Sequence, residues 1–316
     1  MLITTFRKLW KTHAPLTLSG FIIAFLTLFF VLGAFTDPRV ITGAPAWLKP
    51  IKFGVSFTLY NLTLVWLLGF IQGRRWLVSI LGWIVIVVMT VEMFVIVTQV
   101  VRGTTSHFNV STSFDAAMWM AMGIAIAVLW LANLVIAALL LFQKFDNPAF
   151  AWAVRLGVII TVIGMGLGFL MTSPTAQQMA DMRAGGTGDI IGAHTVGLSD
   201  GGSGLPLLGW STVGGDLRIP HFIGMHALQL IPFVGWLISR RRQWSMRSRV
   251  ALVGILSGFY FGVTALLTVQ ALRAQPLIHP DALTLGLFVA LAVVTGIAAW
   301  LVMRGSEPNS PEVSYV

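Results

Sequence analysis

Cysteine is absent from the sequence of 316 residues, and this excludes disulfide bonds, thiolate metal sites, iron–sulfur clusters and cysteine nucleophiles. Charge is also scarce, because only 10% of the residues are Asp, Glu, Lys or Arg, whereas a soluble domain has about 25%. Hydrophobic residues make up 57% of the chain, and the mean hydropathy is +0.87. These proportions exclude a soluble domain and predict an all-α polytopic membrane protein.

The apolar residues are grouped in long runs. A bilayer core about 30 Å thick needs roughly 20 apolar residues per helix. Runs of about this length predict eight transmembrane helices, at approximately 16–36, 53–71, 77–101, 116–142, 156–173, 219–239, 250–270 and 282–303. We expect residues 1–303 to form one transmembrane domain and 304–316 a short polar cytoplasmic tail. The expected partner is the lipid bilayer of a cell membrane, a bacterial inner membrane.

The net charge of +9 indicates orientation rather than a nucleic-acid partner, because the basic residues lie in short clusters between apolar runs. Placing the N-terminus in the cytoplasm puts 13 of the 20 Lys and Arg residues inside, most tellingly in the short loops 72–76 and 240–249. Both termini are then cytoplasmic. No nucleic-acid partner is expected.

Two glycine patterns bear on packing. Gly254, Gly258 and Gly262 share one helix face, as do Gly164 and Gly168, and small residues let neighbouring membrane helices approach closely. We expect these faces to pack inside the bundle. A homo-oligomer contact through either face is the alternative.

The connection at 174–218 is far longer than an ordinary loop and is therefore either functional or disordered. Eleven of the 32 glycines lie between Gly185 and Gly215, but they alternate with apolar residues. A solvated linker does not need that much apolar surface. We predict an ordered, glycine-rich extracytoplasmic cap that begins with a short helix near 175–184, with a disordered loop as the alternative.

The histidines lie mostly on the predicted outer side of the membrane. His107 is in the loop after the third span, His194 is in the cap, and His221 and His226 open the sixth span. Neutral imidazoles bind divalent metals, and Asp200, Asp115 or Asp216 could complete a coordination sphere. The candidate metal ligands are His107, His194, His221, His226 and Asp200. The alternative is that these histidines form hydrogen bonds to loop backbone.

Helix geometry separates two of these histidines. Five positions turn a helix by about 500°, so the side chains of His221 and His226 point about 140° apart and should not chelate one ion together. His226 aligns instead with Gln229. This pair needs a polar partner within the bilayer.

The third span supplies a buried acid. Glu92 lies ten residues before Arg102, about 15 Å along the helix, and Gln99 is on the same face. An intramembrane carboxylate indicates a functional site, although a structural, hydrogen-bonded Glu is the alternative. Lys52 on the second span is a further pocket candidate, unless it extends to the interface.

Three functions compete on this evidence. The first is a metal-dependent membrane enzyme acting on a lipidic or small substrate, with Glu92 or Asp216 as the general base. The second is a proton-coupled or ion-coupled transporter that uses Glu92 and His226. The third, ranked lowest, is a redox protein that binds haem or quinone.

Overall fold

The computed structural model describes residues 2–305, and residues 306–316 of the predicted tail lie outside the described residues. The elements are α1 (Leu2–Thr36), β1 (Val40–Ile41), β2 (Ala44–Pro45), α2 (Leu48–Leu68), α3 (Arg75–Arg102), α4 (Ser113–Leu141), α5 (Pro148–Gly166), the 3-10 helix η1 (Leu167–Met171), α6 (Ala176–Arg183), β3 (Thr195–Val196), β4 (Gly215–Asp216), α7 (Arg218–Ser239), α8 (Met246–Leu272) and α9 (Ala282–Arg304). Eight of these helices are long and apolar enough to cross a membrane. The prediction of an all-α protein with eight long apolar helices that could each cross a membrane is confirmed.

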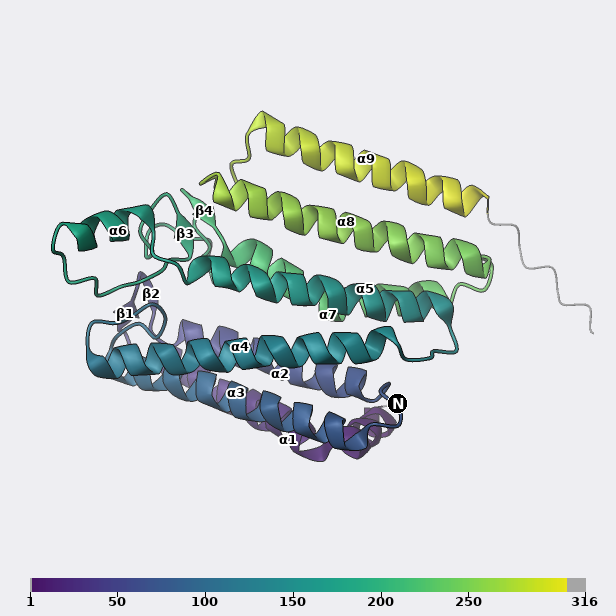
Figure 1. The fold of residues 1–316 in the computed structure, drawn as a ribbon, viewed down its shortest axis with the longest axis horizontal. Helices are drawn as coiled ribbons and strands as arrows, with labels where there is room; N and C mark the ends of the chain where they lie inside the picture. The colour runs from purple at the N-terminus through teal and green to yellow at the C-terminus, as the bar shows by residue number, and fades with distance from the viewer. Residues whose placement is uncertain (1, 306–316) are drawn as a thin grey trace, which may run out of the picture.

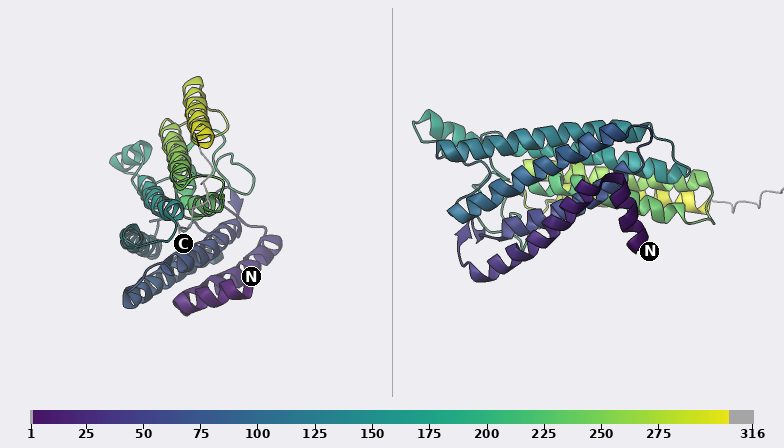
Figure 2. Two further views of the ribbon diagram at one scale, coloured as in Figure 1. Left: turned by 90° about the vertical axis from the view of Figure 1, so that its right-hand side faces the viewer. Right: turned by 90° about the horizontal axis from the view of Figure 1, so that it is seen from below.

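The first helix begins earlier than its apolar run. The polar residues before residue 16 still belong to α1, which changes direction at His13, where φ is −158° and ψ is 91°. Pro15 follows this position and cannot donate the backbone hydrogen bond of a regular helix. The right panel of Figure 2 shows the resulting bend near the N-terminus.

The long helices lie side by side in two groups, α1–α4 and α5–α9 (Figure 1). Within the second group, α5 and α7 approach so closely that a Cβ atom added to Gly164 would lie 2.4 Å from the carbonyl carbon of Gly224. Gly164 and Gly168 therefore pack inside the bundle, since Gly168 faces the ring of His221. The outermost helix, α9, packs on α8, and none of its most apolar stretch is buried.

The second glycine pattern behaves differently. Gly262 packs against Leu291 of α9, whereas Gly254 and Gly258 meet no atom of the described chain within 4 Å of an added Cβ. The internal-packing prediction therefore holds for only one of the three. Contact with another copy through Gly254 and Gly258 stays a prediction.

The two ends of the bundle differ. We call the end that carries residues 174–217 the cap end and the other the short-loop end (Figure 1). At the cap end, β1 pairs with β2 and β3 pairs with β4, both antiparallel. The loop between α3 and α4 also joins the cap, because Ile191 N donates to Phe108 O and Val110 N donates to Asp189 O. Segment 174–217 thus bridges the two helix groups. Which side of the membrane the cap end faces stays a prediction.

Candidate functional site

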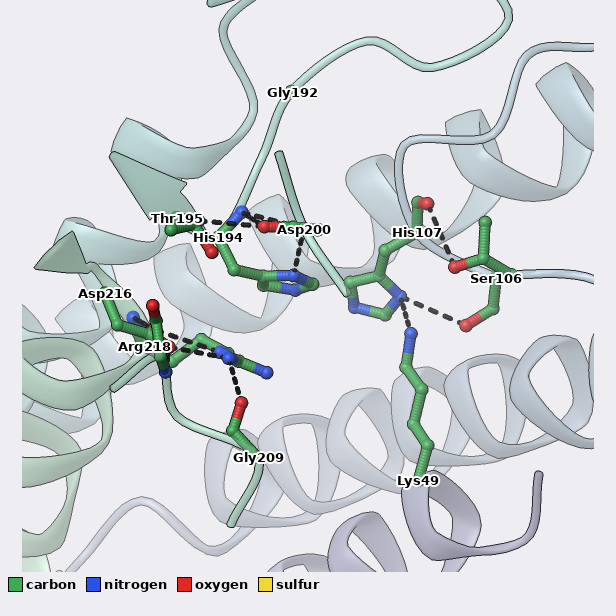
Figure 3. Close-up of polar contacts among 12 residues, drawn as sticks. Lys49, Ser106, His107, Gly192, His194, Thr195, Asp200, Gly209, Asp216 and Arg218 are labelled. Carbon is green, nitrogen blue, oxygen red and sulfur yellow. Dashed lines mark hydrogen bonds and ion pairs between the residues drawn. The ribbon is translucent and has the colours of Figure 1, made fainter. Parts of the chain in front are cut away.

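Beneath the cap, charged and imidazole side chains from separate elements converge. We call Lys49, His107, His194, Asp200 and Arg218 the cap cluster (Figure 3). Lys49 begins α2, His107 is in the α3–α4 loop, and Arg218 begins α7, while His194 and Asp200 belong to the cap. The cluster therefore draws on both helix groups. The predicted convergence of His107 and His194 is present, with ring centroids 6.2 Å apart.

The position of His194 is fixed by Asp200. The Nδ1 atom of His194 lies 2.6 Å from Asp200 Oδ2, and the backbone N–H groups of His194 and Thr195 donate to the same carboxylate. A carboxylate held in this way orients the imidazole and leaves its Nε2 atom directed away from the bond. Phe108 packs edge-on against the ring, with centroids 4.8 Å apart.

His107 meets a cation. Lys49 Nζ lies 3.0 Å from His107 Nδ1, and the hydroxyl of the buried Ser106 lies 3.2 Å from the same nitrogen. Because an ammonium group can only donate, His107 Nδ1 accepts this hydrogen bond. Trp119 covers the ring, with centroids 5.5 Å apart. His107 is thus a neutral acceptor between α2 and the cap.

Burial sets the protonation of these two rings. It lowers the pKa of His107 well below the ordinary value of 6.5, and the charge of Lys49 and the neighbouring His194 act in the same direction. Burial also lowers the pKa of His194, although Asp200 opposes the shift. Burial alone would raise the pKa of Asp200, but the bonds from His194 and Thr195 bring it below its ordinary range. Both imidazoles are neutral at neutral pH.

Glu92 lies below the cluster within α3. Its side chain is only 1% exposed, and its Oε1 atom has no hydrogen-bond partner in the described part of the chain. The charge that acts on Glu92 is that of Lys49. A buried polar atom without a partner is costly and therefore calls for an explanation. Lys49 links Glu92 electrostatically to His107 and the cap.

Asp216, whose role as a general base stays a prediction, holds the start of α7 through its contacts. It is buried and forms an ion pair with Arg218, with 2.6 Å between Oδ2 and Nη2. Its two oxygens also accept from the backbone N–H groups of Ser211 and Arg218. With its carboxylate fully engaged, Asp216 fixes the start of α7.

Two successive carbonyl groups of the cap receive the cations of opposite helix groups. Lys52 of α2 donates to Leu208 O at 3.0 Å, and Arg218 of α7 donates to the next carbonyl, Gly209 O, at 2.5 Å. The prediction that Lys52 lines a pocket or extends to the interface stays a prediction, and the structure shows its bond to Leu208 O. It ties α2 to the cap.

The metal-binding prediction is not supported. Among residues 2–305, no group of three or more His, Asp or Glu side chains is placed to hold a metal ion. The physical reason is that the predicted ligands have other partners. Asp200 binds His194, the Lys49 ammonium lies at Nδ1 of His107, and His221 Nδ1 lies 2.8 Å from Gly164 O.

The remaining predicted residues lie elsewhere. Gln99 and Asp115 form a separate cluster with Arg102, in which Gln99 Nε2 donates to Asp115 Oδ1 at 2.7 Å and Arg102 is paired with the same carboxylate. Thr112 caps α4 beside them by accepting from Asp115 N. This network joins α3 to α4.

His226 and Gln229 face a groove between the helix groups. This cavity of about 860 Å³ is lined by Thr63 and Trp66 of α2, Tyr260 of α8 and one face of α7. His221 instead faces α5, so the two histidines of α7 diverge as their spacing predicts. The proton-linked pair of Glu92 and His226 stays a prediction, and the charge that acts on Glu92 is that of Lys49.

Sequence reasoning missed Lys49. A lysine in the first turn of a membrane helix usually extends to the interface, so its position in the sequence does not indicate a buried site. The signal that could have found it is its spacing of three residues from Lys52, which places both cations on one helix face.

No known family model, curated protein or solved structure matches this chain.

Proposed function

We propose that the protein is a proton-coupled membrane carrier in which the cap cluster passes protons between the cap side and Glu92. The observation that carries this proposal is the row of proton-exchanging groups formed by Asp200, His194, His107, Lys49 and Glu92. Intramembrane carboxyl and imidazole groups arranged in this way are typical of proton relays in pumps and transporters.

The architecture supports coupling between protons and movement. The cap cluster joins the two helix groups at the cap end, because Lys49 and His107 belong to one group and His194 and Arg218 to the other. Charging both imidazoles would place positive charges on two rings 6.2 Å apart, beside Lys49 and Arg218. Repulsion among these groups would weaken the contacts that join the two helix groups at the cap end.

Glu92 supplies the other end of the relay. Since its Oε1 atom lacks a hydrogen-bond partner within residues 2–305, a proton on Glu92 changes the charge balance with Lys49 without breaking an existing bond at that atom. Neutralising Glu92 frees Lys49 of its counter-charge and so strengthens its repulsion of a protonated His107. The two events reinforce each other.

The test does not require a known cargo. Membrane vesicles containing the protein are incubated with a total metabolite and lipid extract of the host cells, with and without an imposed pH gradient, and their contents are compared by mass spectrometry. We expect at least one compound to accumulate only with the gradient. The substitution Glu92→Gln keeps the shape of the side chain, removes its titration and should abolish this accumulation.

The matched control is Asp181→Asn on the exposed surface of α6. It makes the same chemical change outside the relay, so it should leave accumulation intact. Gradient-dependent accumulation that is equal in wild-type and Glu92→Gln vesicles would contradict the carrier proposal.

A second candidate rests on the bond between Asp200 and His194. A histidine oriented by a carboxylate is also the arrangement of a general base, so an enzyme that needs no metal would use His194. In the same experiment, an enzyme converts a compound of the extract without any gradient, and His194→Gln stops the conversion while Glu92→Gln does not.

A further inference from the structure

The groove between α2, α7 and α8 lies within the membrane-spanning part of the bundle. Gln229 is eleven residues after Arg218, which places it about 16 Å along α7 and near the middle of a core about 30 Å thick. The volume of about 860 Å³ lies in the range of roughly 300–1,000 Å³ typical of pockets for small molecules. Hydrocarbon is therefore the solvent at its mouth.

Most of the groove is apolar. Trp66, Leu230, Phe233 and Trp236 line it and leave large parts of their side chains exposed. Such a surface suits an alkyl or isoprenyl chain, and it lies where only membrane-soluble molecules reach it from the bilayer.

Polar groups interrupt this surface. Gln229 Oε1 is buried and has no hydrogen-bond partner among the described residues, while the imidazole of His226 is exposed and lines the same groove. An unpaired amide oxygen inside a membrane costs free energy that a bound donor would recover. A pure hydrocarbon chain cannot supply that donor.

We infer that the groove binds a single-chain amphiphile whose head group carries a hydroxyl, with the hydroxyl donating to Gln229 Oε1 and the chain packing on the aromatic wall. This inference rests on the proposed carrier function in one respect: the amphiphile is the cargo of that carrier. The groove lies between the two helix groups and is lined by α2 and α7, the helices that carry Lys52 and Arg218.

The test uses octadecanol that carries a diazirine in its chain. The full-length protein is reconstituted in phosphatidylcholine vesicles, illuminated with this probe, and the labelled peptides are mapped by mass spectrometry. We expect labelling concentrated in the α7 peptide that contains Gln229. Unlabelled octadecanol should compete roughly three- to tenfold better than octadecyl methyl ether, which has the same chain and no donor.

Two variants locate the preference. Gln229→Leu removes the acceptor and should make alcohol and ether equal competitors, while Gln177→Leu, the same change on the exposed face of α6, should leave the preference intact. Equal competition in the wild-type protein, or labelling spread evenly over α1 and α9, would overturn the inference, because either result describes ordinary annular lipid.

Failure of the inference and failure of the carrier proposal are distinguishable. The labelling needs no pH gradient, so selective labelling without gradient-driven accumulation would leave the binding site standing and remove the carrier function. Gradient-driven accumulation without selective labelling would leave the carrier and remove only this cargo class.

Discussion

The two helix groups are joined by different chemistry at the two ends of the bundle, and we call each set of contacts a closure. At the cap end, α2 and α7 are tied through cations, carbonyl groups and neutral imidazoles, including the bonds of Lys52 to Leu208 O and of Arg218 to Gly209 O. At the short-loop end, α2 meets α5 through aromatic rings, with Trp66 and Phe70 packed on Phe150 at centroid distances of 6.0 and 5.6 Å. The first closure depends on protonation, whereas the second depends on dispersion and apolar burial.

This difference indicates which end responds to protons. Ring packing has no titratable group, so the short-loop closure keeps the same strength across pH. The cap closure changes its charge when His107 and His194 take up protons. A proton-coupled movement should therefore begin at the cap end.

The largest effect is expected from Asp216→Ala. The substitution leaves the Arg218 guanidinium, with 21% of its side chain exposed, without its fully buried counter-ion, and breaking such a pair costs about 3–5 kcal/mol. Thermal unfolding in detergent should shift strongly, and limited proteolysis should cut within the cap. Asp181→Ala, at an exposed position on α6, is the control and should shift neither. An unaltered cap in Asp216→Ala would show that the pair does not hold the cap end.

The opposite end is tested by Phe150→Ala. Phe150 packs against Trp66, Phe70 and Phe145, and because its ring is only partly buried, its truncation should cost about 2 kcal/mol. Since the chain has no cysteine, Thr63→Cys in the groove provides a single reactive thiol. In the Phe150→Ala background, reaction with an impermeant maleimide should rise equally at pH 5 and pH 7.5. A rise confined to low pH would contradict the assignment of this end to apolar packing.

The cap end should open on acidification. The pKa values of both imidazoles lie below the ordinary 6.5 in the closed form, so the closed form binds fewer protons than an open form in which the rings are hydrated. Its advantage is complete above about pH 6.5 and is lost as the pH falls toward the lowered pKa values, by up to tenfold per unit for each ring. Maleimide labelling of the Thr63→Cys protein should therefore rise roughly tenfold between pH 7.5 and pH 5.

Histidine variants sharpen that measurement. His107→Gln or His194→Gln should flatten the rise, because each removes one titrating ring. The control is His279→Gln, at an exposed position outside the cap cluster. An unchanged pH profile in both cluster variants would remove the imidazoles from the closure.

The smallest effect is expected from Lys52→Met. It removes one bond from α2 to the cap while keeping an unbranched side chain, and a single hydrogen bond contributes about 1 kcal/mol. Labelling of the Thr63→Cys protein at pH 7.5 should rise severalfold. No change would place the strength of the cap end entirely in the cap cluster.

The helices were predictable because a membrane demands apolar length. The last run, 282–303, is helical from Ala282 to Arg304, but the first begins at Leu2 rather than near 16. The difference arises because polar residues before Pro15 extend the helix beyond its apolar run and across the bend at His13. Apolar length predicts the spanning part of a helix and not its polar extension.

The site was only partly predictable. Helix geometry predicted that the side chains of His221 and His226 diverge. The position of His107 and His194 on the same predicted side of the membrane made both candidates for one site. The partners of each group could not be predicted, because they come from elements distant in sequence. Lys49 approaches His107 across 58 residues, and this contact makes His107 Nδ1 the acceptor for an ammonium group.

The contact between Gly164 and Gly224 sets the mechanics of the second helix group. No side chain separates the two backbones there, so α5 and α7 are packed tightly together and should move as one rigid unit. This unit carries Arg218 at the cap end, and near the short-loop end Gly235 packs on Ala153. A displacement at the cap end is therefore transmitted along the whole length of the groove wall.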